Sequence, residues 1–305
     1  MRLDDQGQSH QPDGGTVETM TAPARNAALV RGSFGQSQRP LPTGPASLAA
    51  MLTGAVAALA TAFWPWLAQA DAQVNAVTST ALVMVLLPVI MLLVLAQMTN
   101  GAMDAKALAL LGVLAAVIAA IRPLGSGVGG VETVFFVMIL AGRVFGPGFG
   151  YALGAVSILA SALLTGGVGP WMGMQMACSA WIGAGAGWLP ARPRGRAELA
   201  MLAAYGVVVS YLFGALMNLW FWPTMAGSGP QAGGLGFLPG GPVAENLRRF
   251  ATFTLLTSTT SWDTVRAVTC AACILALGKP TLALLRRAAT RAAFIAPETP
   301  PGTRC

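Results

Sequence analysis

The sequence predicts an all-α membrane protein whose chain crosses a bilayer eight times, with both termini on the cytoplasmic side. Three observations predict this fold class. Of the 305 residues, 55% are hydrophobic and only 10% are charged, whereas a soluble globular protein is about 25% charged. Apolar runs close to the roughly 20 residues that a spanning helix needs recur along the chain. Basic residues gather between alternate runs, as the positive-inside rule describes.

The first 46 residues are rich in Gln, Ser, Gly and Pro and show no apolar periodicity. Such a composition cannot bury enough apolar surface to fold, so we expect a disordered tail over 1–46. A signal peptide would place its apolar core nearer the start, so we expect this tail to be retained in the cytoplasm.

Eight apolar runs follow the tail. They lie at about 47–67, 77–98, 106–121, 131–145, 148–165, 171–189, 199–222 and 250–278. The runs at 106–121 and 131–145 are short, and we expect them to be tilted or extended by backbone that is buried in protein.

The distribution of charge predicts the orientation. With the N-terminus inside, nine basic residues fall on the inner side: Lys106, Arg143, Arg192, Arg194, Arg196, Lys279, Arg286, Arg287 and Arg291. The outer loops then hold three, Arg122, Arg248 and Arg249. This bias favours eight spans with both termini inside, since the loss of one span would reverse every later loop.

Small residues recur at helical spacing in several runs. Gly146, Gly150 and Gly154 share one helical face, as do Gly183 and Gly187, which favours close helix packing inside the bundle. The run at 106–121 carries a similar smooth surface made by Ala115, Ala116, Ala119 and Ala120. The alanine pattern fits internal packing and the docking of a partner subunit equally well.

The motifs of soluble catalysis are missing. The segment 125–130 matches GxGxxG, but no acidic residue follows at the spacing that a dinucleotide fold requires. The sequence contains no P-loop, HExxH or GxSxG, and its single histidine, His10, lies in the tail. Cys270 and Cys273 form a CxxC inside an apolar run, where packing is the favoured role. We therefore expect no enzyme, no cofactor and no metal. The basic clusters lack interleaved aromatic residues, so we also expect no nucleic-acid partner.

Polar and aromatic residues instead gather at the predicted outer side. Arg122 and Glu132 flank one hinge, where a mutual salt bridge is favoured over direct ligand contact. Trp171 and Gln175 begin the run at 171–189. Asn218, Trp220 and Trp222 end the seventh run, where tryptophan fits an interfacial belt and a ligand site equally well.

The last two features are a long connection and a polar span. Residues 223–249 form a Gly/Pro-rich loop that could act as a lid over the aromatic residues. The final span begins with many Thr and Ser residues and contains Asp263 and Arg266. A charge pair at this depth is a functional hypothesis by default, although a structural ion pair is the favoured alternative here.

Together these segments resemble a known family. The series R-P-L-G…G-V-E-x-V-F-F, G-R-V-F-G-P-G-F-G, G-x-G-P-W-x-x-x-Q-M and W-D-x-x-R-A…G-K-P-x-L-x-x-L-R-R is similar to the substrate-binding S components of energy-coupling factor (ECF) vitamin transporters, most closely the cobalamin type. The resemblance covers about 106–290. It implies a six-helix substrate-binding domain over 106–290. The two additional helices predicted in 47–105 have no counterpart in that six-helix core, and we expect a cytoplasmic tail over 291–305.

The resemblance also implies a function and partners. An S component captures a vitamin, here best matched by cobalamin or a related corrinoid, and delivers it inward with a transmembrane coupling subunit (EcfT-like) and two ABC-type ATPase subunits. The candidate substrate-binding residues are Arg122, Glu132, Trp171, Gln175, Asn218, Trp220, Trp222, Asn246, Arg249, Trp262 and Asp263. The candidate coupling face is Ala115, Ala116, Ala119 and Ala120. The alternative function is a membrane scaffold or receptor that transports nothing.

Overall fold

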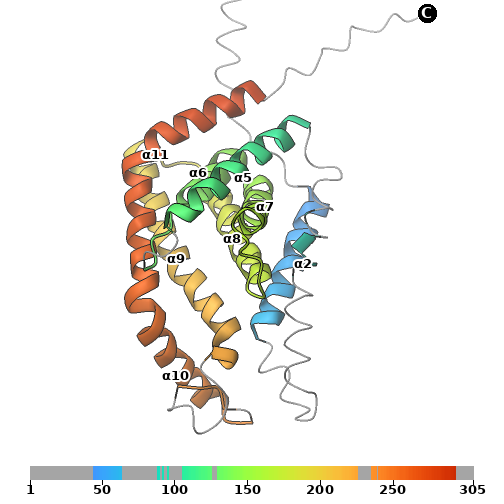
Figure 1. Ribbon diagram of the computed structural model, residues 1–305. Helices are drawn as coiled ribbons and strands as arrows, with labels where there is room; N and C mark the ends of the chain where they lie inside the picture. Colours follow the sequence, from blue (N-terminus) through green and yellow to red (C-terminus); the bar gives the residue numbers. More distant parts are fainter. Residues whose placement is uncertain are drawn as a thin grey trace, which may run out of the picture. The chain divides into compact units, whose positions relative to one another are not determined.

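The structure is a computed structural model that describes residues 44–63, 88, 89, 91, 92, 95, 105–125, 129–225, 235–238 and 240–292. Its described elements are all helical, in agreement with the predicted fold class (Figure 1). They are α2 (Pro45–Ala62), α5 (Ala105–Gly125), α6 (Phe135–Phe145), α7 (Pro147–Thr165), α8 (Met172–Trp188), α9 (Arg196–Met225), α10 (Val243–Thr254), the π-helix η2 (Leu255–Asp263) and α11 (Thr264–Ala292).

Five helical stretches among the described residues are long and apolar enough to cross a membrane: Pro45–Ala62, Ala105–Gly125, Pro147–Thr165, Arg196–Trp222 and Val243–Thr290. The protein is therefore a membrane protein by length and composition of its helices. The second predicted run, 77–98, and both predicted tails lie mostly outside the described residues.

Two predicted lengths were wrong. The run expected at 106–121 is a 21-residue helix, because it continues through Arg122 and Pro123 to Gly125. The run expected at 131–145 is an 11-residue helix, shorter than predicted, because residues 131–134 form an irregular connection before Phe135.

Glycines let α7 and α8 approach closely, as their spacing predicted. Gly150 packs against the backbone of Gly183, and Gly154 packs against the backbone of Ser179. At the next turn Gly187 contacts the backbone of Gly146 and Pro147. A Cβ atom at Gly150, Gly154, Gly183 or Gly187 would collide with the facing backbone, so the two helices could not keep this separation with alanine there.

The expected lid is partly wrong, because its second half is helical. Residues 243–254 form α10, which continues through the π-helix η2 into α11. Only residues 235–238 and 240–242 of the preceding connection are described as irregular backbone. The side chain of Asn246 holds this connection by accepting from Leu238 N–H and donating to Leu238 C=O, at 2.8 and 2.9 Å.

The helices from α5 onward run alternately between two ends of the bundle. At one end, which we call the Arg122 end, Arg122 of α5 contacts Gln175 near the start of α8, and the backbone of Gly130 packs on Trp262. At the other, the Glu198 end, the first turn of α9 contacts Arg143 of α6 and Arg286 of α11.

At the Glu198 end, an ion cluster around a buried carboxylate joins the helices. Glu198 is only 2% exposed. Arg143 Nε donates to its Oε1 at 2.9 Å, and Arg286 Nη2 donates to both carboxylate oxygens at 2.7 and 2.8 Å. The remaining Arg143 donor Nη1 reaches the carbonyl of Leu189 at 2.9 Å. The carboxylate thereby joins α6, α9 and α11, and Arg143 adds the α8–α9 loop through Leu189.

Candidate functional site

The Arg122 side chain ties three helices together at its end of the bundle. Its guanidinium donates to Gln175 Oε1 of α8 at 3.0 Å and to Ser161 Oγ of α7 at 3.4 Å. Among the described residues, no ion pair joins Arg122 to Glu132, so the salt bridge favoured from the sequence is wrong. The reason is that the C-terminal turns of α5 direct Arg122 toward α7 and α8.

Glu132 lies in the connection between α5 and α6, with the positive charges of Arg266 and Arg122 near it. Burial raises the pKa of the Glu132 carboxyl above its usual value, and the two arginines only partly oppose that effect. The neighbouring Gly130 adopts a left-handed φ of 87° where the loop touches the backbone of Trp262. The α5–α6 connection therefore packs directly on η2.

The nine-residue π-helix η2 organises the polar part of the site. Its wider turn brings residues five apart onto one face, so Ser258 Oγ donates to Asp263 Oδ2 at 2.8 Å. The Thr264 hydroxyl likewise donates to Thr259 C=O at 2.6 Å. π-Helical insertions are rare and occur frequently at functional sites.

Asp263 and Arg266 form the ion pair that the sequence predicted at membrane depth. Arg266 Nη1 donates to Asp263 Oδ1 at 2.6 Å, and the Asp263 residue is 1% exposed. Gly214 of α9 faces the Asp263 carboxylate so closely that a Cβ there would overlap it. The Arg266 guanidinium lies 4.9 Å from the centroid of the Phe213 ring, within cation–π range.

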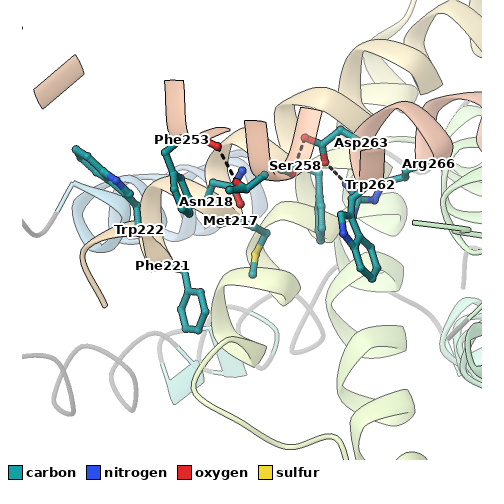
Figure 2. Close-up of a pocket in the computed structure, with 12 residues that line it drawn as sticks. Met217, Asn218, Phe221, Trp222, Phe253, Ser258, Trp262, Asp263 and Arg266 are labelled. Carbon is teal, nitrogen blue, oxygen red and sulfur yellow. Dashed lines mark hydrogen bonds and ion pairs between the residues drawn. The ribbon is translucent and has the colours of Figure 1, made fainter. Parts of the chain in front are cut away.

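A cavity of about 310 Å³ lies between α9 and the continuous α10–η2–α11 helix (Figure 2). Its lining has two kinds of side chain. The aromatic part is Phe213, Phe221, Trp222, Phe253 and Trp262, and the polar part is Asn218, Thr257, Ser258, Asp263 and Arg266. The cavity is therefore amphipathic, with Gly214 and Met217 completing its wall.

Two donors on cavity-lining residues have no hydrogen-bond partner among the described residues. They are Asn218 Nδ2 and Arg266 Nε, both of which are buried. A buried donor without a partner costs about 1–3 kcal/mol, so native proteins seldom keep one without a reason. Both fall on residues that line this cavity. A ligand or solvent that brings hydrogen-bond acceptors would supply the missing partners after a small side-chain adjustment.

The predicted site residues divide into three groups. Asn218, Trp222, Trp262 and Asp263 line the cavity. Asn246 and Arg249 instead hold the 235–242 connection, since Arg249 pairs with Glu245 at 2.8 Å and reaches Gly236 C=O at 3.4 Å. The others lie outside the cavity: Arg122, Glu132, Gln175, the exposed Trp171, and Trp220, which is 3% exposed and stacks on Phe221.

The structure adds residues that the sequence prediction had not assigned to the ligand site. Phe213, Met217 and Phe221 follow i,i+4 spacing along one stripe of α9, and Ser258 lies in η2. The hydroxyl-rich sequence LLTSTTSWD is the one sequence signal that points to a polar lining here. No sequence pattern distinguishes this π-helical segment from an α-helix, and its wider turn is what brings the Ser258 hydroxyl to Asp263.

The four predicted coupling alanines lie on two different faces of α5. Ala115 and Ala119 are 2% and 3% exposed, so they pack inside this chain. Ala116 and Ala120 are exposed, beside the exposed Val113 and Val117. A partner could therefore contact only the second pair.

A second cavity, of about 400 Å³, lies between α2, α8 and α9. Its lining is almost wholly apolar, with Trp181, Phe213 and Leu216 among its larger side chains. The Tyr205 hydroxyl at its edge already donates to Ile182 C=O at 2.8 Å. Trp181 Nε1, a buried donor with no hydrogen-bond partner among the described residues, also belongs to this lining, so the second space offers one hydrogen-bond donor in an otherwise apolar wall.

No family model, curated protein or solved structure matches the chain. Among the described residues, no group of three or more His, Cys, Asp or Glu side chains is placed to hold a metal ion. The cavity lining presents hydrogen-bonding groups, aromatic rings, one carboxylate and one guanidinium group to a solute.

Proposed function

We propose that this protein is a solute-binding membrane subunit of an ATP-driven importer of the ECF type, and that its ligand occupies the cavity between α9 and η2. The observation that carries the proposal is the coincidence of an amphipathic cavity with two buried, unpartnered donors, Asn218 Nδ2 and Arg266 Nε. Ligand sites are mostly apolar and contain a few polar groups that fix orientation. The resemblance of the motif series over 106–290 supports the transport class.

The size of the cavity favours a small ligand. At about 310 Å³ it lies at the lower end of the range of roughly 300–1,000 Å³ that is usual for drug-sized molecules. A small vitamin or vitamin precursor with carbonyl or carboxylate acceptors fits that size and donor set. A corrinoid, which is a large macrocycle, would require α9 and η2 to move apart.

The coupling subunit and the two ATPase subunits belong to the same proposal. The exposed stripe of Val113, Ala116, Val117 and Ala120 on α5 is smooth enough for close contact with another membrane helix. Copurification of ATPase subunits with the protein from its native membrane would support this assembly. Their absence, together with unimpaired uptake in cells that lack the protein, would favour the scaffold or receptor alternative.

The direct test is equilibrium binding to the purified full-length protein. Radiolabelled cobalamin and a panel of small water-soluble vitamins would be titrated against the wild type, Asn218→Ala and Arg248→Gln. We expect one small vitamin to bind saturably, Asn218→Ala to weaken it at least tenfold, and Arg248→Gln to leave it unchanged. Arg248 is a suitable control because its side chain is 68% exposed and does not line the cavity.

Each outcome has a defined meaning. If cobalamin binds saturably and Asn218→Ala abolishes that binding, cobalamin is the ligand, and α9 and η2 must separate to admit it. Saturable binding that Asn218→Ala leaves unchanged would place the ligand elsewhere. No saturable binding of any compound to a folded sample would overturn the proposed function.

A further inference from the structure

The Glu198 end of the bundle carries a concentration of exposed positive charge. Exposed basic residues there include Arg192, Arg194, Arg196, Lys279 and Arg287. The α8–α9 loop joins this end through the contact of Arg143 with Leu189 C=O, and Lys279 follows Gly278, which packs on Leu199. Among the described residues, Glu198 is the only carboxylate at this end, and it is already bonded to two guanidinium groups. The surface is left strongly positive.

The helix α11 changes direction within this charged region. Pro280 lies inside it and has no N–H to donate to the preceding turn, which is a standard cause of a helix kink. Figure 1 shows the last, red part of α11 running obliquely to the part before it. Beyond the kink, Leu282 and Leu285 are 3% and 4% exposed, so one face of this segment packs on the bundle.

The opposite face of α11 mixes leucine with basic residues. Leu275 and Leu277 precede Lys279 and are 56% and 50% exposed, and Leu284 precedes Arg287 and is 66% exposed. Exposed leucines on a spanning helix face lipid chains, so Lys279 lies where the apolar surface of the span ends. That depth is the headgroup region, where long basic side chains place their charge.

The Arg286–Glu198 contact fixes this segment in place. Arg286 is bound through both oxygens of a buried carboxylate that Arg143 also contacts, so the helix cannot rotate freely about its axis. Lys279 and Arg287 form no ion pair with any described residue. Their charges are therefore available to a partner outside the chain.

We propose that the Glu198 end is a binding surface for anionic phospholipid headgroups, with α11 beyond Pro280 acting as an interfacial helix whose Lys279 and Arg287 contact lipid phosphates. The loop arginines Arg192, Arg194 and Arg196 add to the attraction. A basic side chain near an anionic bilayer surface contributes appreciably to lipid attraction, and several together select anionic lipids over neutral ones. The proposal depends on membrane residence alone and not on the ligand of the α9–η2 cavity.

Spin-label electron resonance of lipids at the protein surface tests this directly. The full-length protein would be reconstituted into phosphatidylcholine vesicles with trace spin-labelled phosphatidylglycerol or spin-labelled phosphatidylcholine. The wild type should hold the anionic lipid several-fold more strongly than the neutral one, and added salt should reduce the ratio. The double variant Lys279→Gln/Arg287→Gln should lower the ratio clearly, leaving only the part that the loop arginines contribute.

The matched control is Arg248→Gln, which removes an exposed positive charge at the opposite end. It should keep the wild-type ratio. Neither the double variant nor the control removes a buried contact, so all three proteins should melt at similar temperatures. An unchanged ratio in the double variant, or an equal loss in the control, would overturn the proposal. A second result would also overturn the proposal. If the wild-type ratio were one, and a protein that copurifies with the wild type were lost from the double variant, the surface would be assigned to an acidic protein partner.

Discussion

The two ends of the bundle each bury a carboxylate against arginine, yet they differ in how completely the polar groups are bonded. Glu198 receives hydrogen bonds at both oxygens from two arginines, and Arg143 also reaches a backbone carbonyl. Asp263 is likewise bonded, to Ser258 and Arg266, but Arg266 Nε and the nearby Asn218 Nδ2 have no partner among the described residues. One cluster is saturated, and the other is not.

The difference indicates different roles. A saturated buried cluster is explained by the structure it holds, since every group in it contributes to joining α6, α9 and α11. An incompletely bonded cluster beside a cavity requires a further explanation, such as ligand binding, because unpaired donors destabilise the fold. If the proposed ligand site is right, the Glu198 cluster serves stability and the Asp263 cluster serves ligand binding, and substitutions at the two ends should separate the two effects.

The largest effect on stability should follow Glu198→Ala. Removing this carboxylate leaves Arg143, whose side chain is 9% exposed, without its charge partner. Breaking one partner of a buried ion pair costs about 3–5 kcal/mol. We expect a large fall in the melting temperature of the purified protein, measured by differential scanning fluorimetry, while any ligand affinity of the protein that remains folded stays near the wild-type value. A melting temperature unchanged from wild type would show that the cluster is not structural.

The substitution Asp263→Asn should change both stability and ligand affinity. The amide keeps the shape of the side chain and one acceptor for Arg266, so the loss of stability should be smaller than at Glu198. The negative charge that balances Arg266 is lost, however, and the cavity becomes more positive. Ligand affinity should therefore change at least tenfold, with weaker binding for a cationic or neutral ligand and tighter binding for an anionic one. Isothermal titration calorimetry with the ligand identified by the binding panel would measure the change. Equal affinities in both proteins would remove Asp263 from the site.

The sequence predicted the class of this fold because a helix that crosses a bilayer needs a long apolar run, and such runs are visible in the hydropathy and low charge of the chain. The glycine spacing predicted close helix packing, although only the structure shows that α7 and α8 are the partners, at Gly150 and Gly183. It predicted Asp263 with Arg266, because a charge pair in an apolar run has few explanations.

Other features depend on tertiary geometry and could not be predicted. Arg122 contacts Gln175 and not the nearby Glu132, because α5 continues beyond Arg122 and turns that side chain toward α8. Asn246 looked like a ligand residue, but both halves of its amide are bonded to Leu238. The π-helical register of η2, which aligns Ser258 with Asp263, has no sequence signature that distinguishes it from an α-helix.

The two asparagines at the Arg122 end provide a sharper comparison than the two carboxylates. Asn246 is 0% exposed and both its Oδ1 and its Nδ2 are hydrogen-bonded, whereas Asn218 has an unpartnered Nδ2. Asn246→Ala should lower stability by about 1–3 kcal/mol, because Leu238 N–H and C=O lose their partners. Asn218→Ala should leave stability within about 1 kcal/mol of wild type, or raise it, and weaken ligand binding. Thermal melts paired with binding isotherms would check both. A strong destabilisation by Asn218→Ala would contradict the assignment of its amide to ligand binding.

The smallest effect should be the pH dependence that Glu132 contributes. Burial raises the pKa of this carboxyl above 4.5, so the folded protein holds the proton more tightly than the unfolded chain does. The stability linked to Glu132 is therefore fully present below about pH 4.5 and decreases as pH rises through the raised pKa. Glu132→Gln stays neutral at every pH and should remove this dependence. The melting temperatures of wild type and Glu132→Gln should therefore differ more as pH rises from acid to neutral. At neutral pH the variant should be the more stable protein, because it carries no buried charge at this position. Parallel curves would show that the Glu132 carboxylate is stabilised as fully by Arg266 and Arg122 as it is by water.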